Sequence, residues 1–380
     1  MSAPATMSPR ERLLAAFRRQ PVDQVPFTPL LEGYFQASLG DEFLRQLPIQ
    51  DLQYELTGQI LIRAAVVKVN APVWIGAFWP EDPPAGIEQK LYRENGAIVH
   101  VTETPVGSLR WKLEYRPESP YIPWVLENRI HTLEDIRTLQ YVVEKASFKL
   151  TTEYFDEVTA KVGEKGLITI LGPTSPLQQM INFDAGVERV AYLLADYPDE
   201  MNEMLEACHD LHLRIWKAVA ELPCEVYFLH DNLSSTTTSR RMYRRYDRRF
   251  VNDYAAALSR AGDKKLLTHW CGRLTAFADD FAEARHAGVS DVTPLPTGDM
   301  DIVEARKTWA KQFIVMGGID PTLFARGTPA DVDSYVDGLL TRMEPDRRGF
   351  ILGSGDAVPF GTPPENVRAA AAAAARFRVD

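Results

Sequence analysis

The second half of the chain alternates short apolar runs with longer stretches of helical periodicity. Six such runs, each expected to be a buried strand, lie at 166–172, 225–231, 265–271, 289–293, 313–318 and 350–353. Strands that alternate with helices form parallel sheets, so this pattern predicts an α/β fold. Two further strands expected at 22–31 and 72–79 bring the number to eight. Eight units in one chain favour a TIM-type (β/α)8 barrel over an open sheet.

The first third of the chain has a different pattern. Ser8 and Pro9 begin an N-terminal helix, and a second helix is expected over 49–67. Residues 91–101 and 109–115 alternate apolar and polar side chains, Glu94-Asn95-Gly96 is a turn signal between strands, and 117–123 is expected to be a loop. Together they predict an antiparallel β insertion over about 87–123, after strand 2, within one TIM-type barrel domain that spans residues 1–380.

Composition and motifs exclude several classes of protein. The chain has 42 basic and 52 acidic residues, a net charge of −10, which argues against general nucleic-acid binding. It contains no run of about 18 apolar residues, so no membrane span is expected. The N-terminus lacks a signal peptide and the three cysteines are sparse, which together predict a cytoplasmic protein. Neither a Gly-x-Gly-x-x-Gly nor a P-loop motif follows a strand, which disfavours a doubly wound nucleotide-binding fold.

Polar residues gather where the expected strands end, and in a barrel the carboxyl ends of the strands carry the chemistry. The residues so placed are Glu32, Tyr34, His230, Asp231, Asn232, His269, Cys271, Thr293, Asp299, Asp320, Ser354 and Asp356. Some have structural alternatives. Asp231 and Asn232 can cap a loop and helix, and Asp299 and Asp320 can each be a helix N-cap.

His269 and Cys271 are the most informative pair. Residues i and i+2 of a strand point to the same side, so the imidazole and the thiol would project together. Nitrogen and sulfur ligands suit zinc. Without further context, a buried histidine beside an inert thiol is the alternative.

Arginines are concentrated in the segment 240–249. They fall on two adjacent rows of a helix, where like charges repel unless acids offset them. We expect them to pair with the protein's own carboxylates. The alternative is that they bind an anionic partner or a phosphate-bearing ligand.

Several segments carry a resemblance to a known family. They lie at 10–26, 104–109, 230–235, 269–272, 317–321 and 353–363. The chain resembles the uroporphyrinogen decarboxylase superfamily and, within it, the zinc-dependent, corrinoid-linked methyltransferase branch. The resemblance covers nearly the whole chain and implies a TIM-type barrel.

Two departures qualify what the resemblance implies. The decarboxylases have an Arg-Gln-Ala-Gly-Arg type motif after strand 1, whereas here strand 1 runs into residues 31–36 without arginine, so uroporphyrinogen decarboxylation is not expected. The methyltransferase branch adds a cysteine after strand 8 to its His-x-Cys pair. Here Asp356 stands at that place, and a carboxylate keeps the zinc site neutral. Alternatively, Glu32 or His230 completes the site.

The resemblance implies a zinc-dependent methyltransferase that acts on a small-molecule substrate. His269, Cys271 and Asp356 would hold Zn²⁺. The methyl carrier would be a corrinoid on a separate protein, or another carrier, since the chain lacks an Asp-x-His-x-x-Gly motif. A related reaction is demethylation of a small methylated substrate.

The remaining site residues divide into two predicted roles. Asp231, Glu32 and His230 are the catalytic candidates, and they would handle protons. Tyr34, Asn232 and Asp299 are the candidates for substrate binding. One alternative function is a metal-independent, decarboxylase-like lyase that uses Asp231 and Asp299 on an acidic substrate. The other is a non-catalytic barrel that binds a partner through its arginines.

Overall fold

The computed structural model describes residues 6–31, 46–73, 82–116, 119–281, 283–309, 313–343 and 347–379. Their main sheet is parallel and curled, with the order β1-β8-β9-β10-β11-β12-β13. These strands are β1 (Ile60–Ala65), β8 (Gly166–Gly172), β9 (Val226–Leu229), β10 (Lys265–His269), β11 (Gly288–Val292), β12 (Ile314–Ile319) and β13 (Phe350–Ser354). The α/β fold is confirmed, and six of the expected strands lie where the sequence predicted them.

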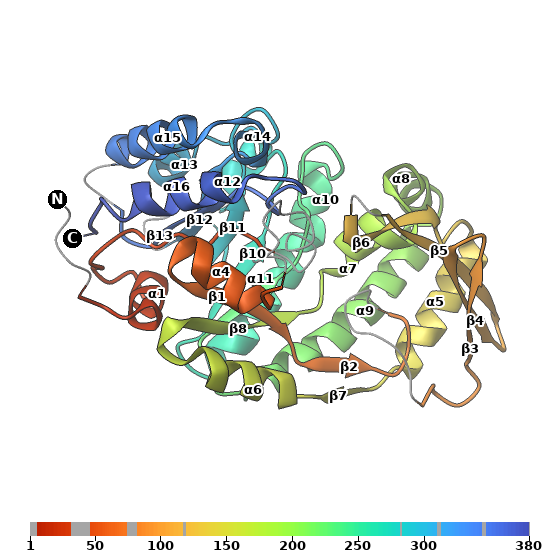
Figure 1. Ribbon diagram of the computed structural model, residues 1–380. Helices are drawn as coiled ribbons and strands as arrows, with labels where there is room; N and C mark the ends of the chain where they lie inside the picture. The colour runs from red at the N-terminus through yellow and green to blue at the C-terminus, as the bar shows by residue number, and fades with distance from the viewer. Residues whose placement is uncertain are drawn as a thin grey trace.

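Helices cover the outside of this sheet (Figure 1). Apart from α5 (Leu133–Lys145), which packs on the insertion, the described α-helices are α1 (Pro9–Phe17), α4 (Ile49–Thr57), α6 (Glu153–Val162), α7 (Pro176–Gln179), α8 (Val187–Asp196), α9 (Pro198–Val219), α10 (Arg240–Arg245), α11 (Asp247–Arg260), α12 (Ala278–Phe281), α13 (Ile302–Thr308), α14 (Pro321–Arg326), α15 (Pro329–Arg342) and α16 (Pro364–Ala374). Short 3-10 helices at Gly163–Lys165 and Thr275–Phe277 and a π-helix at Met180–Asp184 complete the set. None of the described helices is long and apolar enough to cross a membrane.

The segment expected to be strand 1 lies beside β13 but does not form a regular strand. Thr28 donates its backbone N–H to the carbonyl of Leu352, and Leu352 donates to that of Pro26, at 2.8 and 2.9 Å. On the other side, the side chain of Gln59 donates to the carbonyl of Phe27 at 2.7 Å. Pro26 and Pro29 have no N–H, so a continuous ladder cannot form here. The described residues therefore give a seven-stranded curled sheet rather than the predicted eight regular strands.

The helix expected over 49–67 was wrong in its C-terminal boundary, and the strand expected over 72–79 lies mostly outside the described residues. Helix α4 ends at Thr57 because Gly58 adopts a left-handed conformation with φ of 72°. The chain then forms β1, whose apolar residues the sequence analysis assigned to the helix. Residues 72 and 73 are not in a strand, and 74–79 lie outside the described residues.

The β insertion is confirmed as a four-stranded antiparallel sheet and extends four residues further than expected. Its strands are β3 (Glu88–Glu94), β4 (Ala97–Thr104), β5 (Gly107–Arg116) and β6 (Ser119–Glu127). One face packs on helix α5 (Leu133–Lys145), where Leu109, Trp111 and Leu113 are buried. The short ribbon of β2 (Val67–Val69) and β7 (Phe148–Leu150) runs between this sheet and the parallel one (Figure 1).

Candidate metal centre

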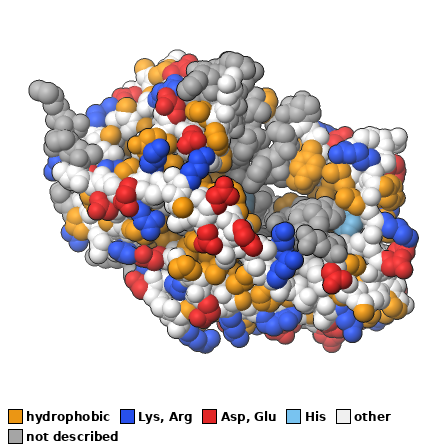
Figure 2. Space-filling model, turned by 60° about the horizontal axis from the view of Figure 1, so that its bottom comes forward, with side chains coloured by type: hydrophobic (Ala, Val, Ile, Leu, Met, Phe, Trp, Pro, Cys, Tyr) orange, Lys and Arg blue, Asp and Glu red, His pale blue; other side chains and the backbone are white. Residues whose placement is uncertain are grey.

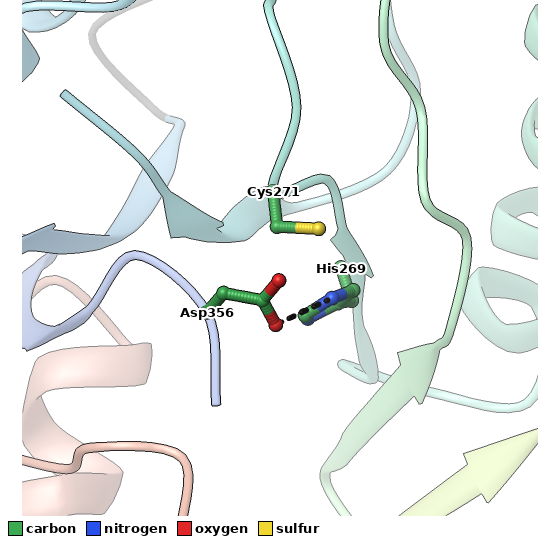
Figure 3. A group of neighbouring side chains, drawn as sticks. All are labelled: His269, Cys271 and Asp356. Atoms are coloured by element: carbon green, nitrogen blue, oxygen red, sulfur yellow. Dashed lines mark ion pairs between the residues drawn. The ribbon is translucent and has the colours of Figure 1, made fainter. Parts of the chain in front are cut away.

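His269, Cys271 and Asp356 come together at the carboxyl end of the parallel sheet. One ligand atom from each side chain lies within 4.8 Å of those of the other two. Figure 3 shows the three side chains pointing toward one another from the end of β10 and the loop after β13. Among the described residues, this is the one group of three or more histidine, cysteine or acidic side chains spaced to hold a metal ion.

Strand alternation fixes the direction of His269 and Cys271. Trp270, which lies between them, points to the opposite side of the sheet. Its ring packs against Tyr243 and Phe281 of the outer helices, with ring centroids 5.8 and 4.9 Å apart. Because successive side chains of an extended chain alternate, burying Trp270 outward turns His269 and Cys271 inward.

Asp291 orients the imidazole of His269. Nδ1 of His269 lies 2.6 Å from a carboxylate oxygen of Asp291, so it donates its hydrogen there. Burial alone would raise the pKa of Asp291, but Arg63 and then His269 outweigh it and hold the pKa well below its usual range. Nε2 of His269 therefore carries the free lone pair, and it lies 3.8 Å from Oδ1 of Asp356. A carboxylate on the second ring nitrogen is the usual partner of a metal-binding histidine.

A bulge in β11 aims Asp291 at His269. Asp291 has a left-handed backbone with φ of 65°, and the pairing of β11 with β12 shifts register between Val289 and Val292. Gly317 of β12 makes room for the bulge, because a Cβ there would lie 2.5 Å from the backbone nitrogen of Val292. Bulges often redirect a side chain next to a functional site. The sequence analysis missed Asp291, and the glycine pair 317–318 was the available signal.

Thr293 ties together the loops that carry Cys271 and Asp356. Its hydroxyl lies within hydrogen-bonding distance of the carbonyl oxygens of Cys271, at 2.9 Å, and of Gly355. A residue larger than glycine would not fit at position 355, because its Cβ would lie 2.7 Å from that hydroxyl oxygen. This contact sets the approach of the loop after β13 to the end of β10.

The electrostatics of the cluster favour a cation. Burial, followed by the carboxylates of Asp356 and Asp291, raises the pKa of the Cys271 thiol well above its ordinary value. Asp356 itself is half exposed, and its Oδ1 accepts a hydrogen bond from the backbone of Ala357. Because two carboxylates oppose a thiolate here, a bound cation would stabilise Cys271 and Asp356 in their anionic forms beside Asp291.

His230 and Asn232 lie beside the cluster, as the strand-end argument predicted. The rings of His230 and His269 are 4.3 Å apart between centroids and nearly perpendicular. Burial, then His269 and Arg63, lowers the pKa of His230 well below its ordinary value, so its imidazole is neutral. The side-chain oxygen of Asn232 lies 3.7 Å from the sulfur of Cys271.

Asp231 lies on the other side of the strand from its neighbour His230. It is fully buried between the sheet and the outer helices, and Oδ1 accepts the backbone N–H of Ser175 at 2.8 Å. Asp247 of α11 contacts the side chain of the same serine. This placement disfavours the predicted role of Asp231 in proton transfer at the barrel mouth. The period of two that brings His230 inward turns Asp231 outward.

Asp299 and Asp320 have structural partners. Asp299 accepts the backbone N–H groups of Leu274 and Thr275, at 2.7 and 3.1 Å, so one of its oxygens caps the 3-10 helix that follows β10. Asp320 is the N-cap of α14, as one alternative predicted. These contacts favour capping over the substrate-binding role predicted for Asp299. Glu32 and Tyr34 lie outside the described residues.

The buried carboxyl group of Asp247, behind the site, should make the folding stability of the protein depend on pH. Burial raises the pKa of Asp247 to about 7, although hydrogen bonds from Gln178 and Ser175 oppose the shift. The folded state therefore holds a proton that the unfolded state releases near pH 4, and stability falls as pH rises from about 4 to 7. Asp247→Asn should gain stability relative to the parent protein over this window, on the order of a few degrees in Tm. Melting curves from pH 4.5 to 8 measure the difference, and a constant difference would contradict it.

Most of the arginines in the segment 240–249 pair within the chain, as expected. Arg240 and Arg244 each donate to the buried carboxylate of Asp280 at 2.6 Å. Arg248 pairs with Glu283, and Arg249 pairs with Glu206. Figure 2 shows basic and acidic side chains interspersed on the face that it displays. Intramolecular ion pairs thus involve four of the six arginines in this segment.

Comparisons with known proteins show the family. The profile of the uroporphyrinogen decarboxylase (URO-D) family matches residues 108–377, more than two thirds of the chain. The chain therefore belongs to the uroporphyrinogen decarboxylase family, which confirms the resemblance seen in the sequence. A search of curated proteins finds no match.

Solved structures show the fold. A methyltransferase from Methanosarcina mazei is 15% identical, with a TM-score of 0.60 and coverage of 97% of this chain and 98% of that one. A putative vitamin-B12 independent methionine synthase from Listeria monocytogenes is 10% identical, with a TM-score of 0.34 and coverage of 58% and 67%. At such low identities a structural likeness shows the fold alone. Only the first structure has a TM-score high enough to support that conclusion.

Proposed function

We propose that this protein is a zinc-dependent methyltransferase that acts on a small-molecule substrate. The observation that carries the proposal is the cluster of His269, Cys271 and Asp356, in which Asp291 leaves Nε2 of His269 free. Membership of an enzyme family and a fold shared with a methyltransferase support it.

The residues present fit zinc. An imidazole nitrogen, a thiolate and a carboxylate are all accepted zinc ligands, and catalytic zinc sites pair three protein ligands with one open position. With a neutral histidine and two anionic ligands, the site carries no net charge. Zinc bound here would supply a Lewis acid that lowers the pKa of a substrate thiol or polarises a leaving atom.

The neighbouring side chains have roles that follow from their positions. His230 is neutral, so it adds no positive charge beside a cation held by His269. Its imidazole can exchange a hydrogen bond with a substrate atom near the cluster. Asn232 can orient a polar substrate group next to Cys271. With Asp231 turned away, His230 is the described residue best placed to handle a proton.

The methyl carrier is proposed to be a corrinoid on a separate protein, or another methyl carrier. The reaction is then transfer of a methyl group between this carrier and a small substrate, or demethylation of a methylated substrate. The lyase alternative has lost support, because Asp231 is buried behind the sheet and Asp299 caps a helix.

Metal analysis and a transfer assay test the proposal together. The purified protein should contain about one zinc per chain, and chelation should stop methyl transfer between a methylated corrinoid and a thiol. Zinc should restore the activity. A protein that holds no zinc and whose activity is insensitive to chelators would instead be a metal-independent enzyme, contrary to the proposal.

A further inference from the structure

Arg63 is a charged side chain inside the curled sheet, next to the candidate metal centre. It comes from β1, and its side chain is only 9% exposed. Its guanidinium lies 4.3 Å above the ring of Phe228, an inward-facing residue of β9. Nη2 donates to Oδ2 of Asp291 at 2.9 Å. Arg63 thus reaches across the interior to the carboxylate that contacts His269.

Three donors from three strands converge on one oxygen of Asp291. They are Nη2 of Arg63, Nδ1 of His269 and Oγ of Ser290, at 2.9, 2.6 and 2.6 Å. This arrangement leaves the carboxylate little freedom to rotate. The orientation of Asp291, and with it the imidazole plane of His269, therefore depends on the position of Arg63.

Stability alone gives no reason for an arginine at this place. Nη1 of Arg63 is buried and has no hydrogen-bond partner among the described residues. A buried guanidinium nitrogen without a partner costs free energy, and an apolar side chain on Phe228 would avoid that cost. Such costs are typical of functional sites.

The charges around the site supply a reason. Cys271, Asp356 and Asp291 contribute three negative charges when ionised, against two on a zinc ion. The single positive charge of Arg63 balances the set. Without Arg63, the charge of Asp291 would be buried and uncompensated, and the carboxylate would lose one of the contacts that hold it against Nδ1 of His269.

We propose that Arg63 is a positioning residue of the metal centre: it holds Asp291 so that His269 presents Nε2 to the metal. The inference rests on the proposed zinc site and adds a residue that contacts neither the metal nor its ligands. Arg63 acts through Asp291. Its effect must therefore disappear when Asp291 can no longer respond to it.

Zinc affinity in a double-mutant cycle tests this inference. Full-length R63Q, D291N and R63Q/D291N would be compared with the parent protein by competition with a chromophoric chelator. Loss of an outer-shell partner weakens metal binding by about 10- to 100-fold, and this loss is expected for R63Q and for D291N. The double variant should bind no more weakly than D291N. Arg63→Lys keeps the charge and one donor, and should retain most of the affinity.

The absorption spectrum of the cobalt(II)-substituted protein gives a second measurement. R63Q should change the cobalt bands because the imidazole ligand is no longer fixed, whereas Arg63→Lys should leave them close to those of the parent. This spectrum reports on the coordination itself and does not depend on knowing the substrate.

The chain offers a matched control. Arg129 pairs with Asp184 at 2.9 Å and lies 4.7 Å above the ring of Trp111, with both charged side chains 2% exposed. Like Arg63 and Asp291, this is a buried arginine–aspartate pair with the guanidinium over an aromatic ring, but it joins the segment between β6 and α5 to the π-helix Met180–Asp184. Arg129→Gln should lower thermal stability, as is also expected for R63Q because each change leaves a buried carboxylate without its ion-pair partner, and it should leave zinc affinity unchanged.

The outcomes separate this inference from the proposed function. A parent protein that binds no zinc overturns both. If the parent binds zinc and R63Q binds it equally well, the inference alone is wrong. Losses that add in the double variant would show that Arg63 acts independently of Asp291, which also overturns it.

Discussion

Replacing Cys271 by serine is expected to remove zinc and abolish methyl transfer. The thiolate is one of three side chains whose ligand atoms lie within 4.8 Å of one another. A serine hydroxyl ionises far less readily than a thiol and binds zinc poorly, so two ligands would remain. The loss of affinity should exceed the roughly 10- to 100-fold typical of an outer-shell partner. Zinc content after dialysis and the rate of transfer from a methylated corrinoid are the measurements.

Cys224→Ser is the control for this substitution. Cys224 is buried near the start of β9, at the opposite end of the sheet, and its thiol donates to the carbonyl of Val226 at 3.1 Å. A serine hydroxyl can take over that hydrogen bond, so zinc and activity should both persist. Full zinc content and full activity in Cys271→Ser would refute the proposed mechanism.

The effect of replacing Asp356 on zinc affinity is expected to depend on whether the new side chain can bind the metal. Asp356→Ala should lower zinc affinity on the order of 100-fold, because it removes a ligand and a negative charge. Asp356→Cys should retain most of the affinity, since a thiolate carries the same charge. The zinc–sulfur distance of about 2.3 Å, against about 2.1 Å for oxygen, partly makes up for the shorter side chain. The Asp356→Cys variant should also show a more intense thiolate-to-metal absorption in its cobalt(II) form.

Asp279→Ala serves as the comparison for a generic loss of one carboxylate. Asp279 is 87% exposed and pairs with Arg240, away from the cluster. Its removal should leave zinc affinity as it is. If Asp356→Ala also kept the parent affinity, Asp356 would not be a ligand, and Glu32 or His230 would become the candidates for the third position.

Patterns of apolar, polar and turn residues over short stretches of the sequence made most of the fold predictable. Alternating apolar strands and amphipathic helices identified six strands of the parallel sheet, and the turn at Asn95 and Gly96 marked the β insertion. The pattern failed between residues 49 and 79. There the left-handed conformation of Gly58 ends a helix and an apolar run becomes β1, a choice that apolar content alone does not make.

The candidate site was predictable only in part. The spacing of His269 and Cys271, together with the family resemblance that places Asp356 at the third ligand position, predicted three side chains that the structure brings together. The side to which Asp231 points was not predictable, because the ends of a strand are not predicted to within one residue and a shift of one residue reverses the side to which a side chain points.

The sequence by itself determined the α/β order of elements, the insertion, the family resemblance and the three candidate ligands, because each rests on local periodicity or on residue types at fixed spacing. Only the tertiary structure decided the surroundings of the ligands. Arg63 and Asp291 stand 228 positions apart, and they meet because a curled sheet places β1 and β11 across one interior. The bulge at Asp291, made possible by Gly317 on the next strand, then turns the carboxylate toward His269. Contacts of this kind depend on strand register and closure, which no local pattern in the chain encodes.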